Sequence, residues 1–234
     1  MTTPSELVFG EHTEIPGTPP EGERLIEAIE GLRQNGVAHV PNTLSPEMTE
    51  ALILEAEGHA FEDHSGEYGL ADQRVENLAI PYPYEGFPTV RGVAMFLNWN
   101  VRWFLPELEG SQNYEPTEAK YNRYPPGEVG ITAHRDRAVD KFMIAAFTLR
   151  GEAEFIVREL PPDGATRDET FAARQEAPVI ESWHTCPGDL VLLRAPGFDG
   201  LAAGRPLHEV TGGNSGERLS LIFRMIDGQD RADG

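Results

Sequence analysis

The spacing of hydrophobic residues divides the chain into an N-terminal helical part and a C-terminal part of short strands. Apolar side chains recur at helical spacing over residues 23–34, and Gly36 follows where a helix would end, which predicts one amphipathic helix. The run 36–42 is strand-like. Ser45-Pro46-Glu47 then reads as an N-cap, a first-turn proline and an early acid, which predicts a second helix to about Gly58.

From Glu118 onward the pattern changes to short apolar runs separated by turn dipeptides such as Arg150-Gly151. The strand-like segments are residues 119–124, 129–136, 142–149, 153–160, 189–195, 207–211 and 218–226. Many short strands at this spacing predict a sandwich or jelly-roll barrel, so the expected fold class is mostly β with flanking helices. Residues 161–178 interrupt the series with a polar stretch, which we interpret as an inserted surface loop with one helical turn.

The same pattern predicts one domain preceded by an arm. Residues 1–22 are rich in Pro, Gly and Glu and show no period, which predicts an extended arm. An all-β barrel of this length often stays undivided, so we expect a single domain over residues 23–234. Within it, residues 23–58 would form a helical support, residues 59–117, dense in aromatics and prolines, would cover a substrate pocket, and residues 118–228 would form the β core.

Composition narrows the classes of partner and compartment. The chain has 19 basic and 39 acidic residues, a net charge of -20, which repels polyanions and disfavours nucleic acid unless a local basic groove overcomes it. Cys186 is the only cysteine, which excludes an internal disulfide framework and a cysteine-rich metal site. The N-terminus lacks a signal-peptide pattern and no run approaches about 18 apolar residues, so we expect a cytoplasmic protein without a membrane span.

Three residues predict a metal site. His134 and Asp136 lie two apart in a predicted strand, so their side chains should point to one face. His208 lies in another strand-like run and would complete a set of two histidines and one carboxylate. Such a set occupies one face of an octahedral ion and leaves the other face open, which suits ferrous iron with an oxoacid and dioxygen.

A second pair predicts a carboxylate clamp. Arg218 and Ser220 share one face of the last predicted strand. An arginine fork can bind a carboxylate through two parallel hydrogen bonds, and a neighbouring hydroxyl can add a third. The order of the metal residues followed by this pair therefore favours an enzyme that binds a dicarboxylate beside its metal.

These motifs, over roughly residues 120–226, resemble those of the iron(II)- and 2-oxoglutarate-dependent oxygenases. The segment Asn122-Arg123-Tyr124-Pro125-Pro126-Gly127, followed by His134-Arg135-Asp136, resembles the AlkB-like branch of that superfamily. Residues 36–52, in contrast, resemble the N-terminal strand and helix of small-molecule hydroxylases. The interval from His208 to Arg218 is also closer to that of small-molecule oxygenases than to that of AlkB.

The resemblance implies a double-stranded β-helix core of the jelly-roll or cupin type. It implies that Asn122 and Tyr124 hydrogen-bond to 2-oxoglutarate, that Arg218 pairs with its distal carboxylate, and that Arg224 lines the co-substrate or substrate site. It also implies that dioxygen is consumed while 2-oxoglutarate is decarboxylated to succinate. The expected outcome is hydroxylation or oxidative demethylation of a small-molecule or amino-acid- or peptide-like substrate. Because Asp136 is retained as a carboxylate ligand, halogenation is not expected.

Two other functions stay open at this stage. One is an AlkB-like nucleic-acid demethylase, and the other is a barrel that binds metal or ligand without catalysis. A repair enzyme needs a basic track beside the flipped base, and the sequence shows no Lys/Arg run, only scattered pairs such as Arg135 and Arg137. The small-molecule or peptide oxygenase is therefore the preferred interpretation.

Other residues have competing interpretations. His184 is the rival third metal ligand, but it precedes a Pro-Gly turn, where the family does not place that ligand, so His208 is preferred. Cys186 would need a neighbouring base to act as a nucleophile, and the sequence fixes none. Six aromatic residues are expected mainly in the core, with some as candidates for pocket lining: Tyr82, Tyr84, Phe87, Phe96, Trp99 and Trp103.

Overall fold

A computed structural model describes residues 22–68, 71–127, 129–160, 167–201, 205–211 and 216–226. The predicted arm over residues 1–22 lies outside these ranges except for Gly22, which begins the first helix. The helices are α1 (Gly22–Asn35), α2 (Pro46–Glu57), α3 (Pro88–Phe104) and α4 (Arg167–Glu176), with a 3-10 helix, η2 (Ser111–Asn113). None of the helices in the described ranges is long and apolar enough to cross a membrane.

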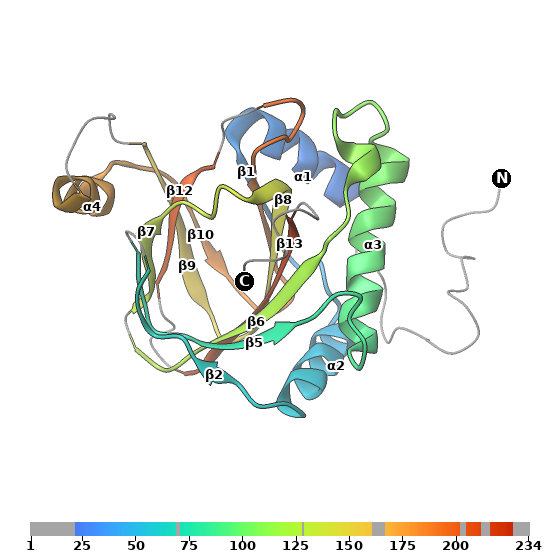
Figure 1. The fold of residues 1–234 in the computed structure, drawn as a ribbon, viewed down its shortest axis with the longest axis horizontal. Helices are drawn as coiled ribbons and strands as arrows, with labels where there is room; N and C mark the ends of the chain where they lie inside the picture. The colour runs from blue at the N-terminus through green and yellow to red at the C-terminus, as the bar shows by residue number, and fades with distance from the viewer. Residues whose placement is uncertain are drawn as a thin grey trace.

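The strands form two antiparallel sheets that face each other (Figure 1). The seven-stranded sheet has the order β1-β11-β8-β13-β6-β5-β2 and the six-stranded sheet the order β10-β9-β12-β7-β4-β3. In chain order the strands are β1 (Val37–Val40), β2 (Glu62–Asp63), β3 (Gly66–Tyr68), β4 (Ala71–Gln73), β5 (Glu76–Ile80), β6 (Glu118–Tyr124), β7 (Val129–His134), β8 (Asp140–Arg150), β9 (Ala153–Arg158), β10 (Val179–Thr185), β11 (Leu190–Arg194), β12 (Leu207–Thr211) and β13 (Arg218–Ile226). The predicted fold class, a mostly β jelly-roll core with flanking helices, is confirmed.

The N-terminal helices cover the outer face of the seven-stranded sheet (Figure 1). As predicted, Ser45 caps α2, and its hydroxyl accepts a hydrogen bond from the backbone amide of Met48 at 3.2 Å. Fully buried side chains from α1, α2 and α3, among them Leu32, Leu52 and Leu97, join the apolar outer face of the sheet in one core. This layer covers the face of the sheet that is opposite the site.

Helix α3 is an element that the sequence analysis did not assign. Its buried residues Val90, Val93, Leu97 and Val101 recur every three or four positions, which is a helical period. Prolines and aromatics before it and exposed Trp103 within it obscure that period. The preceding part of the supposed cover, residues 62–80, contains the short strands β2–β5, which extend both sheets.

The inserted segment also differs from its prediction. The part of it that the structure describes, residues 167–178, contains the ten-residue helix α4 in place of a single helical turn. Strand β10 follows directly and pairs with β9 at the edge of the six-stranded sheet. Most residues of β10 are exposed. Its sequence therefore lacks the continuous apolar run by which the other strands were predicted.

Alternation along the central strands separates core from pocket. On β13, Leu219, Leu221 and Phe223 join the core beneath the helices. The intervening residues, Arg218 and Ser220 among them, point into the space between the two sheets. Strands β6, β8 and β11 alternate in the same way, because successive side chains of a strand face opposite sides. The inner face of this sheet therefore forms a wall of the pocket and carries polar residues such as Arg218 and Ser220.

Candidate metal centre and co-substrate pocket

His134, Asp136 and His208 come together between the sheets. His134 ends β7, His208 lies opposite it on β12, and the two rings are 4.3 Å apart between centroids. One ligand atom from each of the three residues lies within 4.8 Å of the others. The expectation that Asp136 shares a strand with His134 is wrong in detail, because β7 ends at His134 and Asp136 lies in the following loop. That loop nevertheless brings its carboxylate to 3.5 Å from Nε2 of His208.

Backbone carbonyls orient both imidazoles. Nδ1 of His134 lies 2.8 Å from the carbonyl oxygen of Thr132, and Nδ1 of His208 lies 3.2 Å from that of Pro206. A carbonyl can only accept, so Nδ1 carries the proton in each ring and Nε2 keeps its lone pair for a metal. Phe155 stacks on His208 with 5.3 Å between ring centroids and fixes the ring plane.

Arg224 and Arg205 hold the third ligand. Nη2 of Arg224 donates to Oδ1 of Asp136 at 3.2 Å, which leaves Oδ2 directed toward His208. Nη1 of Arg205 donates to the backbone carbonyl of Asp136 at 2.7 Å and so ties down the loop. Arg224 also lies 3.5 Å from carboxylate oxygens of Asp140 and Glu118. Its charge is thus matched by acids of the protein itself.

The electrostatics of the centre suit a divalent cation. Burial by itself would raise the pKa of Asp136, but His208 and Arg224 outweigh it and lower that pKa to about 2. Burial, together with the nearby His208, lowers the pKa of His134 to about 3. At neutral pH the centre therefore presents a carboxylate and a neutral imidazole, which are the protonation states that bind metal.

A small inner pocket extends from these ligands along the sheet. Its volume is about 100 Å³, and about 10–15 Å³ is enough to admit one water, so it has room for a molecule of several heavy atoms. At its far end the register pairs Arg218 with Tyr124 and Ser220 with Asn122. The structure thus brings Arg218, Ser220, Asn122 and Tyr124 together in one pocket, and their binding of 2-oxoglutarate stays a prediction.

This far end has polar atoms without partners. Arg218 is 6% exposed, its Nε makes no hydrogen bond, and no carboxylate of the described residues pairs with it. Burial lowers its pKa, and only Tyr124 opposes that shift. Oγ of Ser220 and Oδ1 of Asn122 are buried and find no hydrogen-bond partner among the described residues either. A buried cation beside unsatisfied polar groups is costly unless an anion binds there, so this end fits the carboxylate of a dicarboxylic acid.

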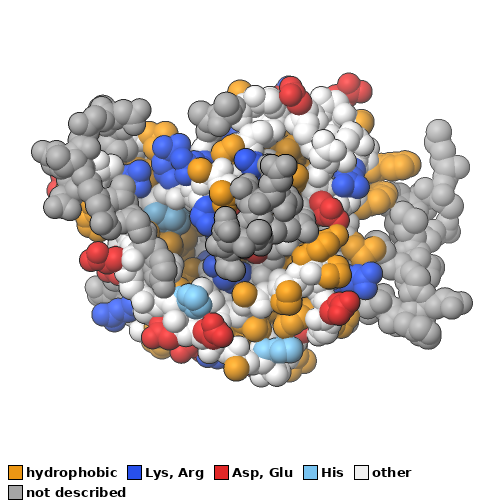
Figure 2. Space-filling model, in the orientation of Figure 1, with side chains coloured by type: hydrophobic (Ala, Val, Ile, Leu, Met, Phe, Trp, Pro, Cys, Tyr) orange, Lys and Arg blue, Asp and Glu red, His pale blue; other side chains and the backbone are white. Residues whose placement is uncertain are grey.

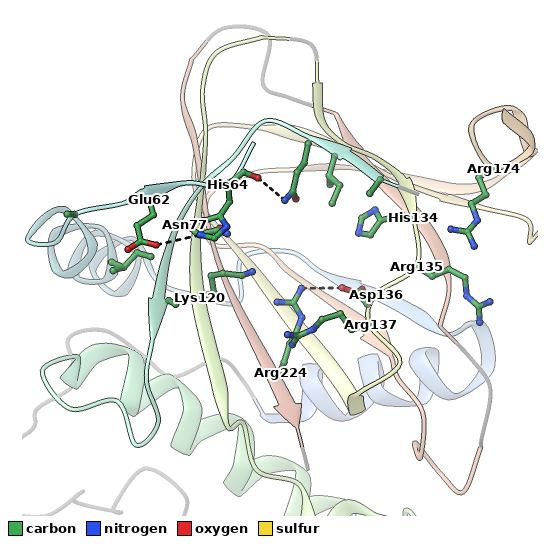
Figure 3. Close-up of a pocket in the computed structure, with 16 residues that line it drawn as sticks. Glu62, His64, Asn77, Lys120, His134, Arg135, Asp136, Arg137, Arg174 and Arg224 are labelled. Carbon is green, nitrogen blue, oxygen red and sulfur yellow. Dashed lines mark hydrogen bonds and ion pairs between the residues drawn. The ribbon is translucent and has the colours of Figure 1, made fainter. Parts of the chain in front are cut away.

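A larger outer pocket of about 640 Å³ opens in front of the metal ligands (Figure 3). Strands β2, β4 and β5 form one side of it, and Arg174 of α4 lies on the other. Several residues from the predicted covering segment, among them Glu62, Gln73 and Asn77, line the pocket, and the role of that segment as a cover for a substrate stays a prediction. Arg224 lies where the two pockets meet, and it lines both.

Several lining residues were not predicted. Lys120 and Asn77 border both pockets, and Lys120 precedes Asn122 by two positions, so strand alternation could have identified it. Burial, and next Arg224, lower the pKa of Lys120 to about 8. Arg174 gave no signal in the sequence because its place depends on how the insertion folds against the core.

The rival candidates lie elsewhere. His184 is exposed on β10, with its Nε2 3.0 Å from a carboxylate oxygen of Glu152, and it is not part of the His134 cluster. Burial raises the pKa of Cys186, which argues against an activated thiolate. Of the six aromatics, Tyr84 and Phe87 are core residues, as expected. None of the six lines the inner or the outer pocket, whereas Tyr82, Tyr84 and Trp99 line a separate pocket of about 410 Å³ beside α3.

This chain is similar to solved structures, although no family model and no curated protein matches its sequence. A prolyl hydroxylase from Trichoplax adhaerens, in complex with a hypoxia inducible factor peptide fragment, matches with a TM-score of 0.59 at 14% identity, over 90% of this chain and 93% of that one. The epimerase SnoN, in complex with Fe³⁺, alpha ketoglutarate and nogalamycin RO, matches with a TM-score of 0.58 at 18% identity, over 88% and 85%. HygX from Streptomyces hygroscopicus, with nickel and 2-oxoglutarate bound, gives 0.55 at 13%, over 85% of each chain.

At these identities the likeness concerns the fold. It extends over 90% of this chain for the Trichoplax protein and 88% for SnoN. The AlkB-like pattern in residues 122–136 stays a prediction from sequence. The chain has the double-stranded β-helix fold of the iron(II)- and 2-oxoglutarate-dependent oxygenases.

Proposed function

We propose that this protein is an iron(II)- and 2-oxoglutarate-dependent dioxygenase that hydroxylates or oxidatively demethylates a small-molecule or peptide-like substrate. The observation that carries the proposal is the buried Arg218, which pairs with no acid of the described residues and lies at the far end of a pocket that begins at His134, Asp136 and His208. A metal-binding barrel without catalysis would have no need of that cation, whose burial is unfavourable without an anionic ligand.

Each residue has a role that follows from its contacts. His134, Asp136 and His208 would hold iron, and Arg218 with Ser220, Asn122 and Tyr124 would bind 2-oxoglutarate. Together with dioxygen, the bound pair supplies the oxidising chemistry: 2-oxoglutarate loses carbon dioxide to become succinate, and one oxygen atom enters a C–H bond of the substrate.

The chain's own residues position the reactants. The carbonyl contacts of the histidines and the contact of Arg224 with Asp136 fix the three ligand atoms before metal arrives. Apolar side chains of the inner pocket, such as Ile144 and Ile222, exclude water beside the ligands. The open side of the centre faces the outer pocket, where a substrate would lie.

The solved neighbours support the choice of ligands and the substrate class. SnoN and HygX bind a metal together with 2-oxoglutarate, and the Trichoplax protein was solved with a peptide. Small molecules and peptides are thus the ligands carried on this fold among these neighbours. The strongly acidic chain argues in the same direction, away from nucleic acid.

The test is turnover of 2-oxoglutarate by the purified full chain. Succinate release should require both iron(II) and oxygen, and adding 2-oxoglutarate to the anaerobic iron-loaded protein should produce a metal-to-ligand charge-transfer band. His208→Ala should lose both signals, whereas His184→Ala, a matched histidine outside the centre, should keep both. A wild-type protein with neither iron dependence nor the band would refute the proposal.

A further inference from the structure

A carboxylate, an imidazole and a thiol meet in one cluster away from both pockets. Glu152, His184 and Cys186 each offer one ligand atom, and these three atoms lie within 4.8 Å of one another. None of the three residues lines the inner or the outer pocket. By contrast, the face of the molecule shown in Figure 2 has Lys and Arg side chains gathered next to α4 and several Asp and Glu side chains along its lower edge. The cluster instead combines the three kinds of donor that bind zinc in proteins.

The pairing of β9 with β10 builds this cluster. The register ends with Ala153 opposite Thr185, so the next residues, Glu152 and Cys186, lie across from each other. Such partners in an antiparallel pair have Cβ atoms about 4.5–5.5 Å apart. His184 precedes Cys186 by two positions and therefore shares its face. The cluster thus follows from strand register and not from a chance approach of loops.

The cluster lies on the solvent face of the six-stranded sheet. Strands β9 and β10 lie side by side at one edge of that sheet (Figure 1). Their alternate residues Phe155 and Trp183 pack inward, between the two sheets, and Phe155 lines the inner pocket. The side chains of His184 and Glu152 are 64% and 61% exposed. A metal bound by them would therefore lie on the opposite face of the sheet from the candidate metal centre.

The distances in the cluster suit one tetrahedral ion. Two ligand atoms of a Zn²⁺ ion are about 3.4–3.6 Å apart, because bonds of about 2.0–2.3 Å meet at the tetrahedral angle. Nε2 of His184 lies 3.0 Å from a carboxylate oxygen of Glu152, and no pair of ligand atoms in the cluster exceeds 4.8 Å. Small rotations of the two exposed side chains are enough to bring all three atoms to bonding distance of one ion.

Hydrogen bonds that leave the ligand atoms free hold the backbone of the cluster. The backbone amide of Cys186 donates to Oδ2 of Asp189 at 2.9 Å, and Oδ1 of Asp189 accepts from the backbone amide of Asn42 at 2.9 Å. The hydroxyl of Thr185 donates to the carbonyl of Ala153 at 3.0 Å. A site whose backbone is already in place loses less conformational freedom when a ligand binds.

The position of the thiol favours a bound cation over a simple ion pair. An exposed pair of His184 with Glu152 would contribute little to stability. It would also leave the Cys186 thiol beside two carboxylates, since burial raises the pKa of that thiol and Asp189 and Glu152 raise it further. A divalent cation would offset these carboxylates, and the thiol proton would pass to the solvent as the thiolate binds.

We propose that Glu152, His184 and Cys186 form a second metal site that binds Zn²⁺, with water in the fourth position of a tetrahedron. Zn²⁺ is bound in proteins by carboxylate, imidazole and thiolate alike, whereas Mg²⁺ and Ca²⁺ take oxygen ligands. Glu154 lies opposite His184 on the same face and adds a negative charge that favours a cation. The thiolate distinguishes this site from the candidate metal centre between the sheets, which offers only nitrogen and oxygen.

The test uses cobalt(II) in place of Zn²⁺ on the reduced, metal-free full chain. Cobalt bound to a thiolate absorbs in the near ultraviolet through sulfur-to-metal charge transfer, and cobalt bound only to nitrogen and oxygen lacks this band. Because Cys186 is the only cysteine of the chain, the band reports this site alone. The wild type should show the band, and His208→Ala, which disables the candidate metal centre, should show it at one cobalt per chain. Added Zn²⁺ should remove the band by displacing cobalt.

Matched variants locate the ligands. Cys186→Ser should lose the band, whereas His184→Ala and Glu152→Gln should each need at least about tenfold more cobalt to develop it, because each lacks one ligand. His59→Ala and Glu181→Gln remove exposed side chains of the same kinds outside the cluster and should bind cobalt as the wild type does. Thermal unfolding of each metal-free variant confirms that it is folded.

Three results would overturn the inference. One is a wild type that shows no charge-transfer band at saturating cobalt. Another is an unchanged cobalt affinity in His184→Ala or in Glu152→Gln, which would remove that residue from the site. The third is a band that saturates at one cobalt for two chains while the protein elutes as a dimer, which would place the metal between two copies.

The second site does not depend on the proposed dioxygenase function. Cys186→Ser should keep the iron- and oxygen-dependent release of succinate, because Cys186 lines neither the inner nor the outer pocket. A protein that shows the cobalt–thiolate band but never consumes 2-oxoglutarate would refute only the proposed function. A protein that consumes 2-oxoglutarate but shows no such band would refute only the second site.

Discussion

Arg218 and Arg224 lie six residues apart on the pocket face of β13, but their surroundings differ. Around Arg224 are three carboxylates, those of Asp136, Asp140 and Glu118. Arg218 lies against the ring of Tyr124, at 5.2 Å from guanidinium carbon to ring centroid, and no acid of the described residues pairs with it. Since both side chains are buried, the difference cannot come from solvent.

The contrast distinguishes two uses of a buried cation. An arginine matched by carboxylates of its own chain positions those carboxylates, and here one of them is a metal ligand. An arginine left unmatched makes the unliganded protein less stable and increases its affinity for an anion. The three predictions below test this division, beginning with the largest effect.

Removal of the Asp136 carboxylate, which is both a candidate metal ligand and a partner of Arg224, should abolish metal binding at that centre. Asp136→Ala takes away a ligand and also a partner of Arg224. Mutation of a residue that hydrogen-bonds to a metal ligand typically lowers metal affinity about 10–100-fold. Loss of a ligand itself should lower the affinity by more than that. Iron content after dialysis and succinate release should both fall to background. Asp72→Ala, an exposed acid on β4, should retain both. Iron bound normally by Asp136→Ala would mean that the three-residue centre is assigned wrongly.

Loss of the matched arginine should destabilise the fold. Arg224→Met leaves Asp136 and the fully buried Asp140 without that cation. Breaking a buried pair from one side costs about 3–5 kcal/mol, because an uncompensated charge stays in the interior. Urea unfolding of the metal-free protein measures this change in the free energy of unfolding. Arg224→Lys should recover part of it. An unchanged midpoint would show that the ion pairs of Arg224 contribute little.

Loss of the unmatched arginine should have the opposite effect on the unliganded protein. Arg218→Met removes a buried cation without leaving an unpaired acid, so the free energy of unfolding should stay constant or rise. Affinity for 2-oxoglutarate should fall by at least about a hundredfold, or roughly 3 kcal/mol, because a charge-assisted bidentate contact is lost. The stabilisation that the ligand gives the wild type should then disappear.

Calorimetry with 2-oxoglutarate and parallel urea unfolding check both halves of this prediction. Arg91→Gln, an exposed arginine on α3, serves as the control for loss of one positive charge. A variant Arg218→Met as destabilised as Arg224→Met would remove the distinction between the two arginines.

The sequence predicted the inner pocket well because strands have a fixed period. Residues two apart on one strand share a face whatever the rest of the fold does, which brought Arg218 together with Ser220 and Asn122 with Tyr124. The pairing of these two strands is not a local property. It followed only from the order of motifs and the resemblance that this order supports.

The outer pocket was largely beyond such reasoning. Arg174 reaches it from an inserted helix, and Asn77 from a short strand in a segment without a clear period. Asp136 was grouped with His134 on the assumption of a shared strand, but it lies beyond the end of β7, and the loop that follows brings the two side chains together. Loop and insertion geometry depends on distant contacts such as that of Arg205 with the carbonyl of Asp136, and these leave no periodic pattern.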